Sequence, residues 1–108
     1  MKMVMAIVNR DDAYVVVHNL TKQGYKVTKL ATVGGFLKVG NMTILMGVED
    51  DKVDEVVSII DRYSKSRKQI MPNSADLGIG GVYAGMPVEV TVGGASIFIW
   101  SVDRFERV

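Results

Sequence analysis

A glycine-rich segment with an aromatic tip carries the residues best suited to binding a ligand. Residues 28–41 read TKLATVGGFLKVGN and place two glycines and Phe36 between two apolar stretches. Glycine lets the backbone approach a ligand closely, Phe36 can stack on a flat ring, and the Asn41 amide can both donate to and accept from a base edge. Lys26 and Thr28 share one strand face and could contact an anion. A glycine-rich hairpin whose Phe36 only caps the core is the alternative interpretation.

The other reactive side chains do not predict a catalytic or metal site. His18 is the only histidine and the chain has no cysteine, so a zinc site and cysteine redox chemistry lack ligands. The carboxylates cluster where helices are expected to start, and capping explains them better than acid–base catalysis. The glycines of residues 78–81 are not followed by the Gly-Lys-Ser/Thr of a phosphate-binding loop. We expect no enzyme, no metal and no cofactor.

Composition narrows the remaining classes. With 108 residues the chain is long enough for one domain, 1–108. Its 13 basic and 12 acidic residues leave a net charge of +1, so no strong field exists to hold a nucleic acid. The apolar run of residues 1–8 is too short for a signal peptide, and no segment approaches the length of a membrane span. The absence of cysteine fits a reducing compartment, so we expect a cytoplasmic protein without membrane insertion.

Hydrophobic spacing predicts two amphipathic helices. Asp11 or Asp12 can cap the first helix and Gly24 can end it, whereas Asp50 or Asp51 opens the second. The apolar positions of the two helices correspond at a constant offset: Ala13, Val16, Val17 and Leu20 in the first, and Val53, Val56, Val57 and Ile60 in the second.

The strands complete a repeated strand–helix unit. Strands are expected at 2–8, 25–33 and 41–48, followed by a final hairpin of 87–92 and 95–102 around Gly93-Gly94. This pattern predicts an α+β fold, a ferredoxin-like βαββαβ sandwich with an additional C-terminal strand and both helices on one face of the sheet. Strands that are apolar on both faces favour packing of subunits against the other face. Residues 67–86 are expected to form a long functional connection.

The chain resembles the PII-like cyclic di-AMP receptors of Gram-positive bacteria over nearly its whole length. The most specific motif is Lys29-Leu30-Ala31-Thr32 followed by Gly34-Gly35-Phe36-Leu37. Further matching segments are Met1-Lys2-Met3 with Ala6-Ile7-Val8, residues 51–55, residues 87–90 with 92–95, Phe98, and Val102-Asp103. The resemblance implies a PII-like homotrimer that binds cyclic di-AMP in three clefts between subunits and signals to an unknown protein partner through rearranged loops.

The resemblance also implies the ligand contacts. The residues that match the family's contacts are Lys26, Thr28, Gly35, Phe36, Leu37, Asn41, Gly47 and Phe98. Lys26 and Thr28 would meet a phosphate, and the backbone at Gly35 and Leu37 would reach polar atoms of the nucleotide. Phe36 would lie on an adenine, Asn41 and the Gly47 backbone would read its edge, and Phe98 would pack from a neighbouring subunit.

Three positions depart from the family pattern. Lys26 stands where an arginine is usual, so a bidentate phosphate contact becomes a point charge. Gly24 replaces an amide side chain. Arg107 stands where the family often has a glutamine and would add a phosphate or stacking contact.

Two other functions fit the same scaffold. A PII-type sensor of ATP and 2-oxoglutarate would need a long loop between the second and third strands, whereas residues 34–40 are short. An acyl-phosphate hydrolase would need an arginine in an anion cradle and an asparagine to place water. Arg10 and Asn41 are the available residues, and Arg10 lies in no glycine-rich cradle.

Overall fold

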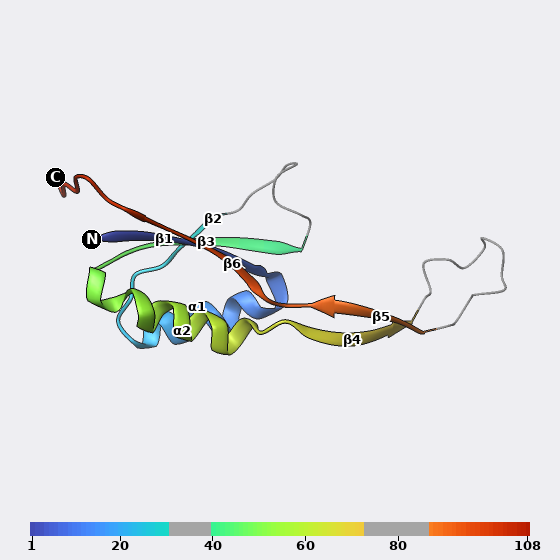
Figure 1. Cartoon of the computed structure of the whole chain (residues 1–108). Coiled ribbons are helices and arrows are strands. Elements are labelled where there is room, and N and C mark those ends of the chain that lie inside the picture. The colour runs from blue at the N-terminus through green and yellow to red at the C-terminus, as the bar shows by residue number, and fades with distance from the viewer. Residues whose placement is uncertain (31–39, 73–86) are drawn as a thin grey trace.

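The computed structural model describes residues 1–30, 40–72 and 87–108 (Figure 1). The elements are β1 (Lys2–Asn9), α1 (Arg10–Lys22), β2 (Thr28–Leu30), β3 (Asn41–Val48), a 3-10 turn (Asp50–Lys52), α2 (Val53–Ser64), β4 (Arg67–Pro72), β5 (Pro87–Val92) and β6 (Ala95–Ser101). Among these described residues, neither helix has the length and apolar character needed to cross a membrane.

Four strands form one antiparallel sheet in the order β2-β3-β1-β6, and α1 and α2 cover one of its faces (Figure 1). This is the ferredoxin-like sandwich that the sequence predicts. Beyond the βαββαβ set, the structure has two strands, β4 and β5, which pair with each other and precede β6. The additional strand expected at the C-terminus is therefore a ribbon inserted before the last strand of the sheet.

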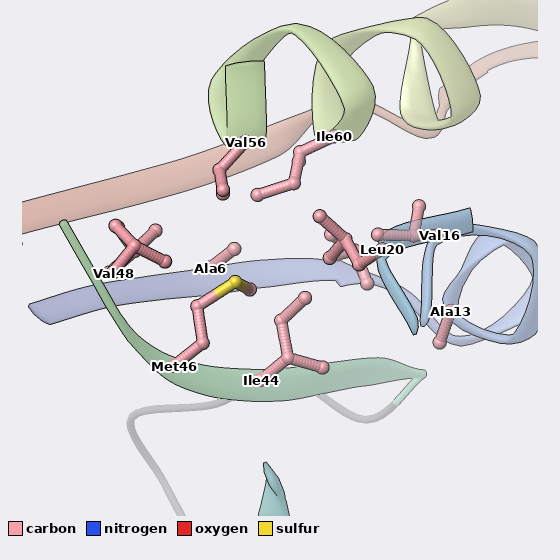
Figure 2. Packing of buried hydrophobic residues seen from close by; sticks show 11 residues of the cluster. Ala6, Ala13, Val16, Leu20, Ile44, Met46, Val48, Val56 and Ile60 are labelled. Carbon is pink, nitrogen blue, oxygen red and sulfur yellow. The ribbon is translucent and has the colours of Figure 1, made fainter. Parts of the chain in front are cut away.

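The core lies between the sheet and the helices (Figure 2). β1 alternates strictly, with Val4, Ala6 and Val8 buried. The repeated apolar positions of the helices meet this strand, because Leu20 of α1 and Ile60 of α2 are both completely buried. Full burial of such a side chain contributes about 1.5–3 kcal/mol, which explains why a helix rich in β-branched valines is stable here.

The caps differ partly from the prediction. Neither Asp11 nor Asp12 caps α1; Asn9 does, because its Oδ1 accepts from the Asp11 N–H at 2.8 Å. The helix starts two or three residues earlier than expected, so the aspartates fall in its first turn, where the helix dipole favours them. Gly24 ends the helix as predicted, with a φ of +95° that glycine adopts without strain.

The predicted final hairpin is wrong. β5 pairs with β4, whereas β6 pairs with β1, so Gly93-Gly94 carries the chain from the ribbon into the sheet and turns no hairpin. The prediction of a loop over 67–86 is also wrong in its first part, because Arg67–Pro72 is β4; residues 73–86 lie outside the described part. The ribbon projects beyond the end of the sheet opposite to the two termini (Figure 1).

Candidate functional site

The strand register divides the predicted site residues between the two faces of the sheet. Directly opposed residues of antiparallel strands share a face. The Val4–Met46 pair is buried under the helices, so the neighbouring Met5–Leu45 pair lies on the other face. We call this second face the open face. Its residues are Met3, Met5, Ile7 and Asn9 of β1; Asn41, Thr43, Leu45 and Gly47 of β3; Thr28 and Leu30 of β2; and Ser96, Phe98 and Trp100 of β6.

The open face holds all four of the predicted site residues that lie on described strands. Thr28, Asn41, Gly47 and Phe98 are separated widely in sequence, yet the register puts them on one surface. Large apolar side chains share it, and Phe98 and Trp100 are 45% and 46% exposed. An apolar surface with a few polar groups is typical of a ligand site or a subunit interface.

Thr28 and Phe98 lie at opposite edges of the sheet. Thr28 of β2 faces Leu45, Leu45 faces Met5, and Met5 faces Phe98 of β6. Three strand spacings separate the two end residues, a distance of about 14 Å. The two side chains therefore cannot contact the same small chemical group within one chain.

A polar cavity of about 260 Å³ lies at one end of the open face and contains Asn41. It is lined by Ile7, Asn9, Asn41, Ser66, Gly93, Gly94, Ala95 and Ser96. Asn41 faces Asn9 across the β1–β3 pair, and Asn9 Oδ1 is already used to cap α1. The cavity is smaller than the roughly 300–1,000 Å³ of pockets for drug-sized ligands, so it fits one part of a nucleotide.

A larger cavity, of about 570 Å³, lies between α2 and β6 and holds none of the predicted site residues. Its charged lining residues are Asp54, Asp61 and Lys65. Two carboxylates against one ammonium group leave an excess of negative charge, so this cavity suits an anionic ligand poorly.

Gly47 is not required by the packing around it. A Cβ placed on Gly47 would have Met1 Sδ as its nearest neighbour, at 3.7 Å, which is an ordinary contact. Its backbone conformation also lies outside the left-handed region. The fold therefore tolerates a side chain here, so neither crowding nor backbone conformation explains the glycine.

The remaining predicted residues lie off the described strands or outside the described residues. Lys26 is exposed in the segment that leads into β2, and Arg107 is exposed after β6. Only Thr28–Leu30 of the strand predicted at 25–33 is described as strand. Gly35, Phe36 and Leu37 lie outside the described part of the chain.

Thr43 is a site feature that the sequence reasoning missed. Its side chain is 2% exposed on the open face, two residues from Asn41, and its Oγ1 has no hydrogen-bond partner among the described residues. Leaving a buried hydroxyl unpaired costs about 1–3 kcal/mol. A polar residue inside the apolar strand 41–48 was the available signal.

Comparison with known proteins identifies the family of this chain. The sequence profile of the cyclic-di-AMP receptor family matches residues 1–108, the whole chain. The chain belongs to the cyclic-di-AMP receptor family. The resemblance found in the sequence is thereby confirmed, and cyclic di-AMP is the ligand of the family.

A solved relative supports the fold of this receptor family member. The chain is similar to the crystal structure of a functionally unknown protein from Pediococcus pentosaceus ATCC 25745. The two share 38% sequence identity with a TM-score of 0.76, and the match covers 99% of this chain and 96% of the other. Within the described residues of the receptor, no group of histidine and acidic side chains is placed to hold a metal ion.

Proposed function

We propose that this protein is a non-enzymatic cytoplasmic receptor, one domain over residues 1–108, that binds cyclic di-AMP on the open face between subunits of a homotrimer. The observation that carries the proposal is the shared face of Thr28, Asn41, Gly47 and Phe98. Membership of the cyclic-di-AMP receptor family supplies the ligand.

Two features of the single chain support a site built from two subunits. The Asn41 cavity, at about 260 Å³, is too small for a cyclic dinucleotide. Thr28 and Phe98 lie about 14 Å apart on opposite edges of the sheet. A neighbour that brings its β6 edge to the β2 edge of the first chain would place both residues on one ligand. The exposed Phe98 and Trp100 would be covered by the same assembly.

Each site residue has a proposed role. Asn41 and the Gly47 backbone read the adenine edge, Phe36 stacks on the ring, and Phe98 packs from the neighbouring subunit. Lys26, Thr28, and the backbone of Gly35 and Leu37 hold the phosphates and other polar atoms of the nucleotide, with Arg107 as an additional cation. Lys26 acts as a point charge, so its phosphate contact lacks the geometric specificity of an arginine fork.

Signalling is proposed to pass through the segments beside the ligand to a downstream protein. A ligand shifts a conformational equilibrium only through contacts that differ between the two states. Residues 34–40 and the connection beyond β4 are the proposed segments, and the ligand would rearrange them by contacts that the free protein lacks.

The start of α1 argues against the acyl-phosphate hydrolase. The N–H of Arg10 donates to the Gly40 carbonyl at 2.6 Å, and the N–H of Asp11 donates to Asn9 Oδ1. Two N–H groups that would cradle a phosphoryl group are therefore occupied, and Asp11 and Asp12 add negative charge at the same place.

Parallel calorimetric titrations with cyclic di-AMP, ATP and acetyl phosphate test the proposal. We expect saturable binding of cyclic di-AMP at one molecule per subunit, no binding of ATP with 2-oxoglutarate, and no hydrolysis of acetyl phosphate. Light scattering should give the mass of three subunits. A monomer mass at micromolar concentration would exclude the intersubunit cleft, and tighter binding of ATP would favour the PII-type sensor.

A further inference from the structure

The junction between the sandwich and the β4–β5 ribbon contains a charged contact that the ligand site does not use. The chain crosses this junction twice, at residues 64–67 on the way out and at Gly93-Gly94 on the way back. Arg67 lies at the first position of β4, and Asp12 lies in the first turn of α1. The contact joins elements that are 55 residues apart in sequence.

Arg67 binds Asp12 with both nitrogens of its guanidinium fork. Nη2 lies 3.0 Å from Asp12 Oδ1 and Nη1 lies 3.2 Å from Oδ2, while Nη1 also donates to the Lys65 carbonyl at 3.2 Å. Asp12 is buried, at 8% exposure. The hydrogen bond to Asp12 and its negative charge raise the pKa of Arg67. A bidentate pair with a buried carboxylate fixes orientation as well as distance.

The returning strand is shaped to fit against this pair. Gly93 and Gly94 have φ of +81° and +80°, which only glycine adopts readily. A Cβ on Gly93 would stand 2.5 Å from Arg67 Nη1 and 2.6 Å from the Lys65 carbonyl. The Gly94 N–H donates to the Ser64 carbonyl. The outgoing crossing is thus held to α1 through Asp12, and the returning crossing is held to the end of α2 through the Ser64 carbonyl.

This junction is also a wall of the Asn41 cavity. Ser66, Gly93 and Gly94 line the cavity together with Asn9 and Asn41. Asn9 caps α1, and Asp12 lies in the first turn of the same helix, so the cavity and the charged pair share this helix start. Because junction residues belong to the cavity lining, a change in the angle of the ribbon would alter that lining.

We propose that Asp12 and Arg67 are a positioning pair, which sets the angle of the ribbon and, through the cavity wall, the affinity for the ligand of Asn41. The affinity half of this proposal rests on the proposed binding of cyclic di-AMP. We call the intact Asp12–Arg67 contact the clamp. By thermodynamic linkage, a ligand that binds more tightly when the clamp is formed also stabilises the clamp, so binding in the cavity affects the ribbon.

The distance between a spin label on α1 and one on β4 reports how the ribbon is oriented relative to the sandwich. The chain has no cysteine, so Lys22→Cys on α1 and Ile70→Cys on β4, both exposed positions, accept labels selectively. Diluting labelled with unlabelled subunits restricts the measured distances to one chain. The variants are Arg67→Gln, Asp12→Asn and both together. The matched control is Lys68→Gln, which removes a cation from the ribbon whose only described ion pair is with Glu89, 3.3 Å away within the ribbon.

We expect Arg67→Gln and Asp12→Asn to broaden the distance distribution without ligand and to weaken binding of cyclic di-AMP by about fivefold or more. The double variant should be no worse than either single one, and Lys68→Gln should change neither reading. Arg67→Lys, which keeps the charge but loses the fork, should fall between wild type and Arg67→Gln. It also replaces Arg67→Gln if that variant fails to fold.

Two results overturn the proposal. If the spin-label distances in Arg67→Gln are distributed as narrowly as in wild type, the pair does not position the ribbon. If the distances broaden but the affinity for cyclic di-AMP is unchanged, the ribbon angle does not affect the cavity. If wild type binds no cyclic di-AMP, the proposed function fails, and the ligand-free distributions still decide whether the clamp exists.

Discussion

The sandwich and the β4–β5 ribbon are held by different forces. The sandwich encloses completely buried side chains such as Val4, Leu20 and Ile60. On the ribbon, Ile70 is 71% exposed, and the Lys68–Glu89 ion pair is open to solvent. Apolar burial stabilises the first region, whereas strand pairing and a junction contact stabilise the second. Segments with little burial open at low free-energy cost, so the ribbon suits a responsive role and the sandwich suits a scaffold.

Truncating one apolar residue in each region should give the largest contrast. Leu20→Ala leaves a cavity between α1 and the sheet, and we expect a loss of about 2–5 kcal/mol in the free energy of unfolding. Ile70→Ala should change it by less than about 0.5 kcal/mol. Urea denaturation at one fixed protein concentration measures both. Similar losses in the two variants would mean that the ribbon is packed like the core.

Removing the Asn41 amide should separate binding from stability. Asn41→Ala should weaken cyclic di-AMP binding by about 1–3 kcal/mol, because a buried partner on the base is left unpaired. Its urea midpoint should remain near that of wild type, since Asn41 lies on the open face away from the core. Asn19→Ala, which removes an amide that donates to the Val15 carbonyl on α1, is the control and should leave calorimetric affinity unchanged. Equal affinity in all three proteins would remove Asn41 from the site.

Gly47→Ala tests whether the ligand approaches the backbone of β3. The nearest contact of the new methyl group would be an ordinary one to Met1 Sδ, so the variant should fold with nearly unchanged stability. We expect weaker binding by about 1–3 kcal/mol if the methyl group separates the ligand from the backbone. Calorimetry and thermal denaturation together give the answer, and a stable variant with full affinity would leave this glycine without a role in binding.

Thr43→Val should leave the ligand-free protein at least as stable as wild type. Valine keeps the shape of threonine and removes a buried hydroxyl that has no partner among the described residues. We expect the free energy of unfolding of the ligand-free protein to stay equal or to rise by up to about 1 kcal/mol. A clear loss of stability would show that the hydroxyl is paired in solution.

The scaffold was predictable from the sequence because its signals are local and repeated. The buried positions Val16 and Val56, like Leu20 and Ile60, occupy equivalent places in two strand–helix units and point into one core. Helix periodicity and strand length do not depend on distant partners. The cap was missed because Asn9 can end the strand or start the helix, and the choice between these depends on the β1–β3 pairing that extends to Asn41.

Strand partners and site geometry were less predictable because they depend on contacts distant in sequence. A Gly-Gly between two apolar runs is typical of a hairpin, yet Gly93-Gly94 leads from one sheet to another. The sequence places Arg67 at the start of a long connection without a partner, because Asp12 is remote in the sequence. The shared face of Thr28 and Phe98 required the register of four strands. Thr43 gave only a weak sign, a single hydroxyl in an apolar run.

The intersubunit site, the central claim, is tested most directly by calorimetry on mixed trimers. One parent carries Lys26→Ala with Thr28→Val and loses the β2 side of the site; the other carries Phe98→Ala and loses the β6 side. Each should bind cyclic di-AMP poorly alone. Refolded together in equal amounts, random assembly into a symmetric trimer should restore about one quarter of the sites, wherever an intact β2 edge meets an intact Phe98 of a neighbour. A mixture that binds no better than its parents would contradict the account and place the site within one chain.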